Sequence, residues 1–227
     1  MTKQYSDLFY WFCSIDPRMG NNSPSTDFSY FLNHYKNLGA KGMGELIANL
    51  YINDPLMENL FFHCAECNMP VIIHIAPSTY GFYGIIDDLG LPRLEKILKK
   101  YPKLKILGHS QPFWAEIGND VTEENRNNYP KGKVSEGRIV KLMREYENLY
   151  GDMSAGSGYN AISRDSEFGY RFINEFKDKL FLGTDICAPH NNMLLSHWLD
   201  KAYEEGNISE DAYRKISRDN AIKILGL

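Results

Sequence analysis

The sequence predicts an α/β fold of the (β/α) barrel type, built as a single domain over residues 1–227. Two observations lead to this prediction. Short apolar runs rich in β-branched and aromatic residues alternate with longer segments of helical periodicity, as in the strand–helix units of a parallel sheet. The runs begin about 30 to 45 residues apart, a spacing typical of a (β/α) barrel of about 250 residues and also of a doubly wound sheet.

Six apolar runs are the predicted strands. They are Leu8–Ile15, Ala40–Leu46, Pro70–Ile75, Leu104–His109, Leu149–Met153 and Leu180–Asp185. Because long helical segments separate them, we expect neighbouring strands to be parallel.

The predicted helices carry recognisable start and stop signals. Asp54 is a candidate N-cap with Pro55 at the first helical position, and Pro92 has the same role as Pro55. The helices are expected over residues 27–38, 54–68, 91–101 and 209–225. The stretch from Gln111 to about Val134 has no period and is predicted to be a long loop, a feature that is often functional in compact domains.

Composition excludes several classes of protein. The chain has 227 residues, 43% of them hydrophobic, so it can bury a sizeable core. Its net charge is -4 and its Lys and Arg residues are scattered, which argues against nucleic acid as a partner. No apolar run is long enough for a membrane helix, and the N-terminus lacks the pattern of a signal peptide. Four cysteines in a chain of this length argue against a disulfide framework, so we expect a cytoplasmic protein. The expected partner is a small-molecule substrate.

Four predicted strands end in residues that bind metals or move protons. These are Glu45, His74, His109 and Asp185. Because the carboxyl ends of parallel strands meet at one rim, we expect the four side chains to lie together. Imidazole and carboxylate are ligands for zinc, manganese or iron, so the sequence predicts a divalent metal, with zinc as the first choice.

Each of these residues also has a structural interpretation. A single His at a strand end is more often a hydrogen-bonded structural residue, Asp185 can cap the next helix, and Glu45 can pair with a Lys or Arg. The four together favour the metal site. The pair Cys64 and Cys67 has helical spacing and lacks a second pair of cysteines, so it favours packing over zinc.

At these same strand ends the sequence resembles the amidohydrolase-related family, in the branch with carboxymuconate-semialdehyde decarboxylase-like proteins. The matching stretches cover most of the chain in the family's order: GAKGMGEL, MPVIIHI, LPRLEKILKKYPKLKILGHS, NLYGDMSA, KLFLGTDI and DNAIKILGL. The resemblance implies a (β/α)8 barrel whose fifth to eighth strands begin with PVIIHI. It implies metal-ligand roles for His74 and His109, a fourth-strand ligand at Glu45, and a metal-proximal acid and base at Asp185.

The family's first strand carries an HxH or ExH pair of metal ligands, and this chain has no such pair. Counting back from PVIIHI, one or two strand–helix units are expected to be missing before Met1. The chain is then a fragment or mis-started version of a longer polypeptide, or a barrel closed by something else. Because an open parallel sheet exposes unpaired strand edges, we expect a homo-oligomer, most simply a dimer.

Four residues outside the rim are candidates for binding substrate. Trp114 directly follows the His109 strand and could wall a cleft, or else pack under the long loop. Tyr159, Asn160 and Arg164 lie after the Leu149–Met153 strand, where the guanidinium could hold a substrate carboxylate. An ion pair with a nearby acid is the competing role for Arg164.

The resulting hypothesis is a metal-dependent hydrolase of a small amide, ester or lactone. The metal would polarise the carbonyl and activate water, and Asp185 would act as general base and then acid. Where His109 is not a ligand, it would orient the carbonyl as a catalytic residue. Non-oxidative decarboxylation of an aromatic or unsaturated acid is the nearest alternative, and a catalytically inactive binding module is the alternative from another class.

Overall fold

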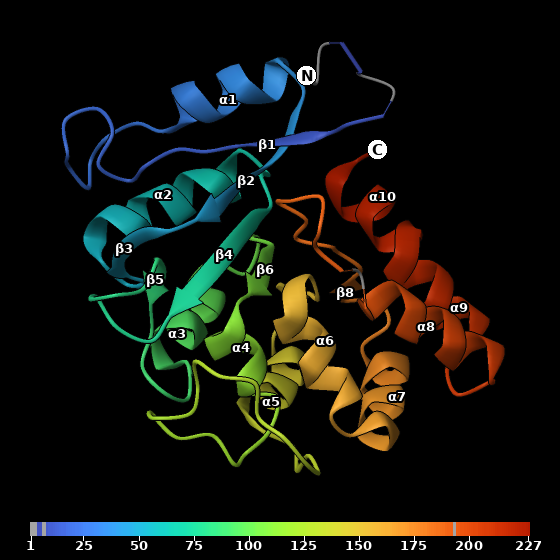
Figure 1. Cartoon of the computed structure of the whole chain (residues 1–227). Helices are drawn as coiled ribbons and strands as arrows, with labels where there is room; N and C mark the ends of the chain where they lie inside the picture. Colours follow the sequence, from blue (N-terminus) through green and yellow to red (C-terminus); the bar gives the residue numbers. More distant parts are fainter. Residues whose placement is uncertain (1–3, 6–7, 193) are drawn as a thin grey trace.

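The computed structural model describes residues 4–5, 8–192 and 194–227 and contains a parallel sheet wrapped by helices (Figure 1). The main sheet has the strand order β1-β2-β4-β6-β7-β8, and every pairing between these strands is parallel. Its strands are β1 (Trp11–Cys13), β2 (Ala40–Leu46), β4 (Val71–Ala76), β6 (Ile106–His109), β7 (Leu149–Asp152) and β8 (Leu180–Phe181). This arrangement confirms the predicted fold class and all six predicted strand positions.

Two further short strands extend the sheet. β3 (Ala48–Tyr51) pairs with β5 (Gly84–Ile86), and β5 also pairs with the end of β4. The sequence analysis did not predict either strand, because each is too short to show a period of its own.

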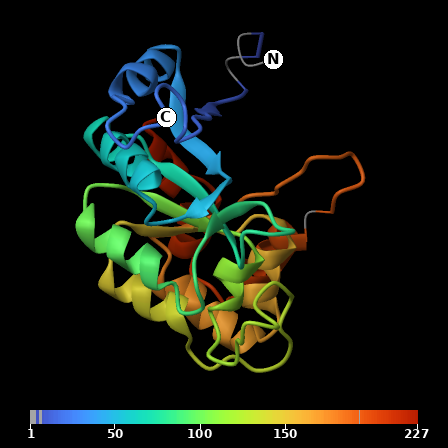
Figure 2. The same ribbon diagram turned by 90° about the vertical axis from the view of Figure 1, so that its left-hand side faces the viewer.

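Helices follow most strands and cover the outside of the sheet. Figure 2 shows α1, α2 and α3 stacked along one side, while the segment after β8 projects from the other side. The helices are α1 (Ser29–Asn37), α2 (Pro55–Glu66), α3 (Pro92–Lys100), α4 (Gln111–Ala115), α5 (Arg138–Glu145), α6 (Ala155–Ser163), α7 (Ser166–Glu175), α8 (Leu194–Glu204), α9 (Glu210–Arg214) and α10 (Asn220–Leu225). None of the helices in the described part is long and apolar enough to cross a bilayer.

The predicted starts of α2 and α3 are confirmed, with Pro55 and Pro92 at the first helical positions, but only α2 has a capping side chain directly before it. The Asp54 side chain accepts a hydrogen bond from the Leu56 backbone N–H at 2.8 Å, and Pro55 opens the helix. At α3 the preceding residue offers no side-chain cap. The Asp87 carboxylate instead accepts from the backbone N–H groups at the helix start, at 3.1 and 2.8 Å.

Three predicted elements differ from the observed ones. The last strand ends at Phe181 instead of Asp185, because the Leu182 N–H donates to the Ile216 carbonyl and no longer belongs to the sheet. The stretch expected to be a loop from Gln111 begins with the short helix α4, capped by Ser110. The C-terminal helix is divided by a π-helical turn over Lys215–Asp219.

The core lies between the sheet and its helices. In β4 the side chains of Val71, Ile73 and Ile75 are fully buried, as are Leu60 and Phe61 on α2. A sheet buried in this way explains why its strands are nearly continuous apolar runs. Polar residues within or at the end of these buried strands are therefore candidates for a functional site.

Candidate metal centre

His74 and His109 come from neighbouring strands and lie directly opposite each other. They are partners in the β4–β6 register, so both side chains leave the same face of the sheet. Their ring centroids are 5.3 Å apart, and both side chains are more than nine-tenths buried. In this arrangement one nitrogen atom of each imidazole is close enough to the other to bind the same metal ion.

Glu45 brings a carboxylate to the same point from β2. The strand is irregular between Met43 and Leu46, next to β4. Gly44 has a φ of 132°, and a Cβ at this position would lie 2.6 Å from the Ile72 carbonyl oxygen. Glycine therefore allows β2 to approach β4 closely beside Glu45.

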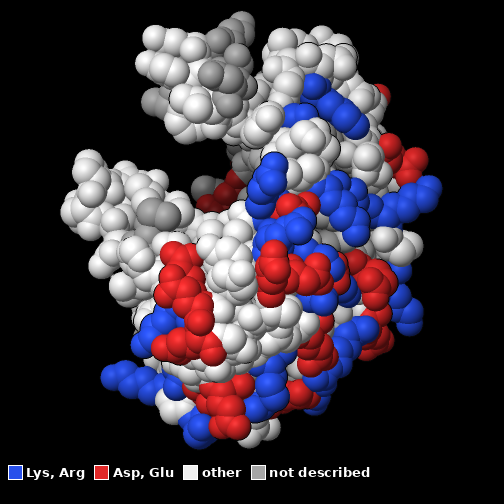
Figure 3. Space-filling view, turned by 90° about the vertical axis from the view of Figure 1, so that its right-hand side faces the viewer, with Lys and Arg blue, Asp and Glu red and all other residues white. Residues whose placement is uncertain are grey.

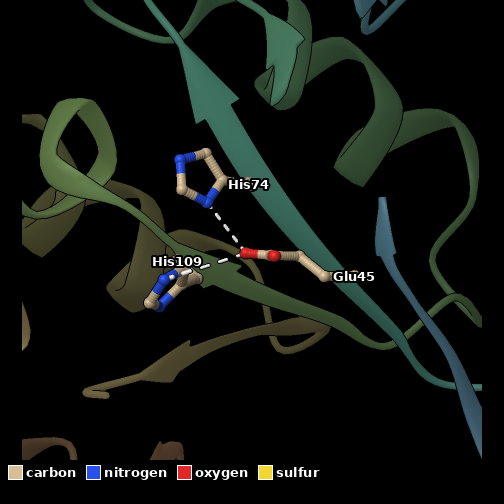
Figure 4. Close-up of side chains that lie close together, drawn as sticks. All are labelled: Glu45, His74 and His109. Carbon is tan, nitrogen blue, oxygen red and sulfur yellow. Dashed lines mark hydrogen bonds and ion pairs between the residues drawn. The ribbon is translucent and has the colours of Figure 1, made fainter. Parts of the chain in front are cut away.

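The Glu45 carboxylate points between the two rings (Figure 4). Its Oε1 atom is 2.8 Å from His74 Nδ1 and 3.8 Å from His109 Nε2. Burial by itself raises the pKa of Glu45, but the hydrogen bond from His74 and the charges of both histidines outweigh it and lower the pKa. The carboxylate is thus held in its charged form.

The ligand atoms of Glu45, His74 and His109 all lie within 4.8 Å of one another. Two imidazole nitrogens and one carboxylate oxygen are a donor set that suits a divalent zinc, manganese or iron ion. The residues present therefore fit the predicted metal.

Two polar residues at the end of β7 were not predicted from the sequence. Asp152 Oδ2 lies 3.5 Å from His109 Nδ1, and the Ser154 hydroxyl lies 3.1 Å from the same nitrogen. Burial raises the pKa of Asp152, while His109 and two hydrogen bonds from Ser154 act in the opposite direction. The sequence does contain a signal for Asp152, because this residue ends the apolar run LYGD just as His109 ends ILGH.

Asp185 lies outside the three-residue ligand group. It is exposed, with a φ of 53°, on the segment that follows β8. It lines a pocket of about 220 Å³ between that segment and the start of α6. Tyr159 lines the same pocket, together with Gly156, Cys187, Asn191 and Asn192.

Tyr83 contacts the ligand group. Its ring packs on His74 with the centroids 4.3 Å apart. Partial burial, followed by the charges of Glu45 and Asp185, raises the pKa of Tyr83, so both carboxylates lie within electrostatic reach. An exposed Tyr after β4 offers no sequence signal that separates it from the neighbouring Tyr80.

Three residues proposed to bind substrate have other contacts. Trp114 is 1% exposed and donates from Nε1 to the Asp152 carbonyl at 2.7 Å, so it packs in the core and does not wall an open cleft. Arg164 pairs with Asp120 at 3.3 Å, which matches the competing ion-pair role. The Asn160 amide donates to the Pro130 carbonyl at 3.1 Å and helps to hold the long loop.

Comparison with known proteins gives one family match. The model of the family described as Amidohydrolase matches residues 33–227. No curated protein matches the chain significantly.

Solved structures with the same fold come from several organisms. An uncharacterised TIM-barrel protein from Bordetella bronchiseptica is 18% identical, with a TM-score of 0.66 over 99% of this chain and 69% of that chain. A probable 2-pyrone-4,6-dicarboxylic acid hydrolase from Acinetobacter baumannii with citric acid bound is 16% identical, with a TM-score of 0.60 over 100% and 76%. A dihydroxybenzoic acid decarboxylase from Polaromonas with bound manganese and 2-nitroresorcinol is 19% identical, with a TM-score of 0.58 over 100% and 71%. At these identities the likeness shows the barrel fold alone.

Proposed function

The chain belongs to the amidohydrolase family, and from this premise we propose that it hydrolyses a small neutral amide, ester or lactone with the help of a divalent metal. The observation that carries the proposal is the group formed by Glu45, His74 and His109, whose ligand atoms lie within 4.8 Å of one another. These three residues would hold the ion, zinc in the first instance and manganese as the alternative. A divalent ion there supplies Lewis acidity toward a carbonyl oxygen and toward water.

Asp185 is the proposed general base and then acid. Its carboxylate lines the pocket and lies within electrostatic reach of Tyr83, and it would accept a proton from water and return it to the leaving group. Tyr159, which lines the same pocket, and Tyr83, whose ring packs on His74, would orient the substrate.

The charge of the pocket supports a neutral substrate. Among the described residues that line the pocket, Asp185 is the only carboxylate and none is a Lys or Arg. A substrate with several carboxylates would find no partner for them there, since the Arg164 guanidinium is paired with Asp120.

Decarboxylation of an aromatic acid is the second candidate. It is favoured by the fold shared with dihydroxybenzoic acid decarboxylase, which binds manganese and an aromatic inhibitor. The exposed ring of Tyr83 above His74 gives an aromatic substrate a surface to pack on. Assays for carbon dioxide release from candidate acids, beside amide, ester and lactone hydrolysis, separate the two reactions.

Metal content is the first test. Plasma mass spectrometry of the purified chain should give close to one ion per chain, and a Glu45→Gln, His74→Ala double variant should give none. The control is His197→Ala, which removes an exposed imidazole on α8. Metal bound equally by parent and double variant would contradict the proposed site, and absence from both would favour a binding module without catalysis.

A further inference from the structure

The two nitrogen atoms of His109 face different partners. Nε2 points toward Glu45 Oε1 at 3.8 Å, whereas Nδ1 lies 3.1 Å from the Ser154 hydroxyl oxygen. A neutral imidazole carries one proton, so only one of its nitrogens can offer a lone pair to a cation. Which nitrogen does so depends on whether the Ser154 hydroxyl donates a hydrogen bond to Nδ1 or accepts one from it.

The direction of the Ser154 hydrogen bonds follows from Asp152. The Ser154 hydroxyl lies 2.9 Å from Asp152 Oδ2, and the Ser154 backbone N–H donates to Oδ1 at 3.0 Å. In this arrangement the Ser154 hydroxyl is the donor to Asp152 Oδ2, and a hydroxyl has only one proton to donate. The hydroxyl oxygen is then left to accept from His109 Nδ1–H.

Ser154 is available for this contact because it does not cap the helix that it precedes. It occupies the N-cap position of α6, where Ser usually bonds to the helix backbone, yet no such side-chain bond is formed. Gly183 makes room for the arrangement, since a Cβ there would lie 2.7 Å from both Asp152 Oδ1 and Ser154 Cβ. Ser154 and His109 are both buried, so little water competes for these bonds.

We propose that Asp152 and Ser154 are positioning residues that hold the proton of His109 on Nδ1 and so keep the Nε2 lone pair directed at the ion site. Partners of this kind orient metal-binding histidines in many proteins, and their loss typically weakens metal binding about 10- to 100-fold. The proposal rests on the proposed function only in naming a divalent ion as the occupant. The tautomer itself is a property of the metal-free chain.

The first experiment therefore uses the metal-free, full-length chain. Long-range ¹H–¹⁵N correlation spectra at pH 8, assigned with a His109→Gln variant, distinguish an imidazole protonated on Nδ1 from one protonated on Nε2. We expect His109 to be the Nδ1–H form. We expect Asp152→Asn to shift it toward the Nε2–H form. The amide of the substituted side chain can donate a hydrogen bond to the Ser154 hydroxyl, which would then donate to His109 Nδ1. An Nε2–H wild type, or a tautomer unchanged by Asp152→Asn, would overturn the proposal.

The second experiment measures manganese affinity by titration calorimetry. Asp152→Asn should weaken binding about 10- to 100-fold, and Ser154→Ala should weaken it less, because Asp152 Oδ2 remains 3.5 Å from His109 Nδ1. Ser154→Thr keeps the hydroxyl and should restore most of the affinity. The Asp152→Asn, Ser154→Ala double variant should bind no more weakly than Asp152→Asn alone, since both residues act through one chain of hydrogen bonds.

Asp165→Asn is the matched control. Asp165 is also a buried carboxylate, which accepts from the Val134 and Phe168 backbone N–H groups near α7. A loss of affinity equal to that of Asp152→Asn would mean that general destabilisation is responsible and would overturn the positioning role. If the parent binds no manganese or zinc, the proposed function fails while the tautomer measurement still decides for or against Asp152 and Ser154.

Discussion

Asp185 and Trp114 both lie just beyond the end of a strand, and their surroundings differ completely. Asp185 is exposed and lines the pocket, while Trp114 lies in the core with its edge on Gly151. A charged residue can remain outside at no cost, whereas a large aromatic gains free energy from burial. The two residues therefore predict opposite effects of substitution on activity and on stability.

Replacing Asp185 with Asn should lower kcat at least about 100-fold, the usual size of a general acid–base contribution. The melting temperature should hardly change, because the side chain is exposed and packs against little. Steady-state kinetics and thermal denaturation check both expectations. Glu124→Gln, at an exposed acid in the long loop, is the control, and unchanged turnover in Asp185→Asn would remove the residue from the mechanism.

Trp114→Ala should destabilise the protein by about 3 to 5 kcal/mol, the range for deleting a buried aromatic side chain. The lost hydrogen bond to the Asp152 carbonyl adds to the cavity that is left. Urea denaturation measures the change. A normal free energy of unfolding combined with a raised KM would instead support the role in a substrate cleft.

At the scale of elements, the long loop after α4 is held by a buried ion pair. Arg126 is fully buried and donates to the Glu116 carboxylate at 3.1 Å and to the Asp87 carbonyl at 3.0 Å. The second oxygen of Glu116 accepts from the Gly90 backbone N–H at 2.9 Å. The loop is thus fastened to the turn between β5 and α3, although its sequence shows no period.

This clamp predicts a specific pH dependence of stability. Burial raises the pKa of Glu116 to about 7, with Arg126 acting in the opposite direction and Asp87 and Glu123 adding to the rise. A carboxyl whose pKa is higher in the folded than in the unfolded state stabilises the fold at low pH. That contribution is lost as pH rises from about 4 through 7, and it amounts to at most about 3 kcal/mol.

Glu116→Gln should remove this part of the pH dependence. The free energy of unfolding of wild type minus that of the variant should therefore decrease between pH 5 and pH 8, as measured with urea. Glu123→Gln removes the more exposed partner of Arg126, and it should reduce the slope only slightly, because the Glu123 charge is a minor cause of the raised pKa of Glu116. A difference that stays constant between pH 5 and pH 8 would show that Glu116 is ionised in both the folded and the unfolded state and that its pKa is not raised.

At the scale of the whole molecule, the described sheet is open, with β1 at one end of the strand order and β8 at the other. Leu8, Phe9 and Tyr10 lie exposed beside β1. Figure 3 shows a face rich in charged side chains, with two projecting lobes at its left and a hollow between them. The exposed apolar side chains of Leu8, Phe9 and Tyr10 favour association with another surface.

The chain should therefore form a homodimer at micromolar concentration. Phe9→Glu should shift it toward the monomer, because a charge at an apolar contact must be desolvated without a partner. Light scattering after size exclusion measures the mass of each. Tyr30→Glu, at an exposed ring on α1, is the control, and a monomeric wild type at all concentrations would make the predicted dimer wrong.

The positions of the six strands of the main sheet and of all three ligand residues could be predicted from the sequence alone. Each strand is an apolar run whose period is local, and His74 and His109 end two such runs. Parallel strands end at one rim by geometry, so residues at equivalent ends meet. Glu45 followed from the same reasoning, although its approach depends on the irregularity at Gly44.

Only the tertiary structure decided which polar residues contact one another. Asp152 and Ser154 reach His109 because β7 pairs with β6, and Arg164 is taken by Asp120, a residue 44 positions away. β8 ends at Phe181, which leaves Asp185 on an exposed segment beside the pocket and outside the ligand group. The hydrophobic period of a segment reflects its own secondary structure. These contacts depend instead on the register and burial of segments that are distant in the sequence, which local patterns do not encode.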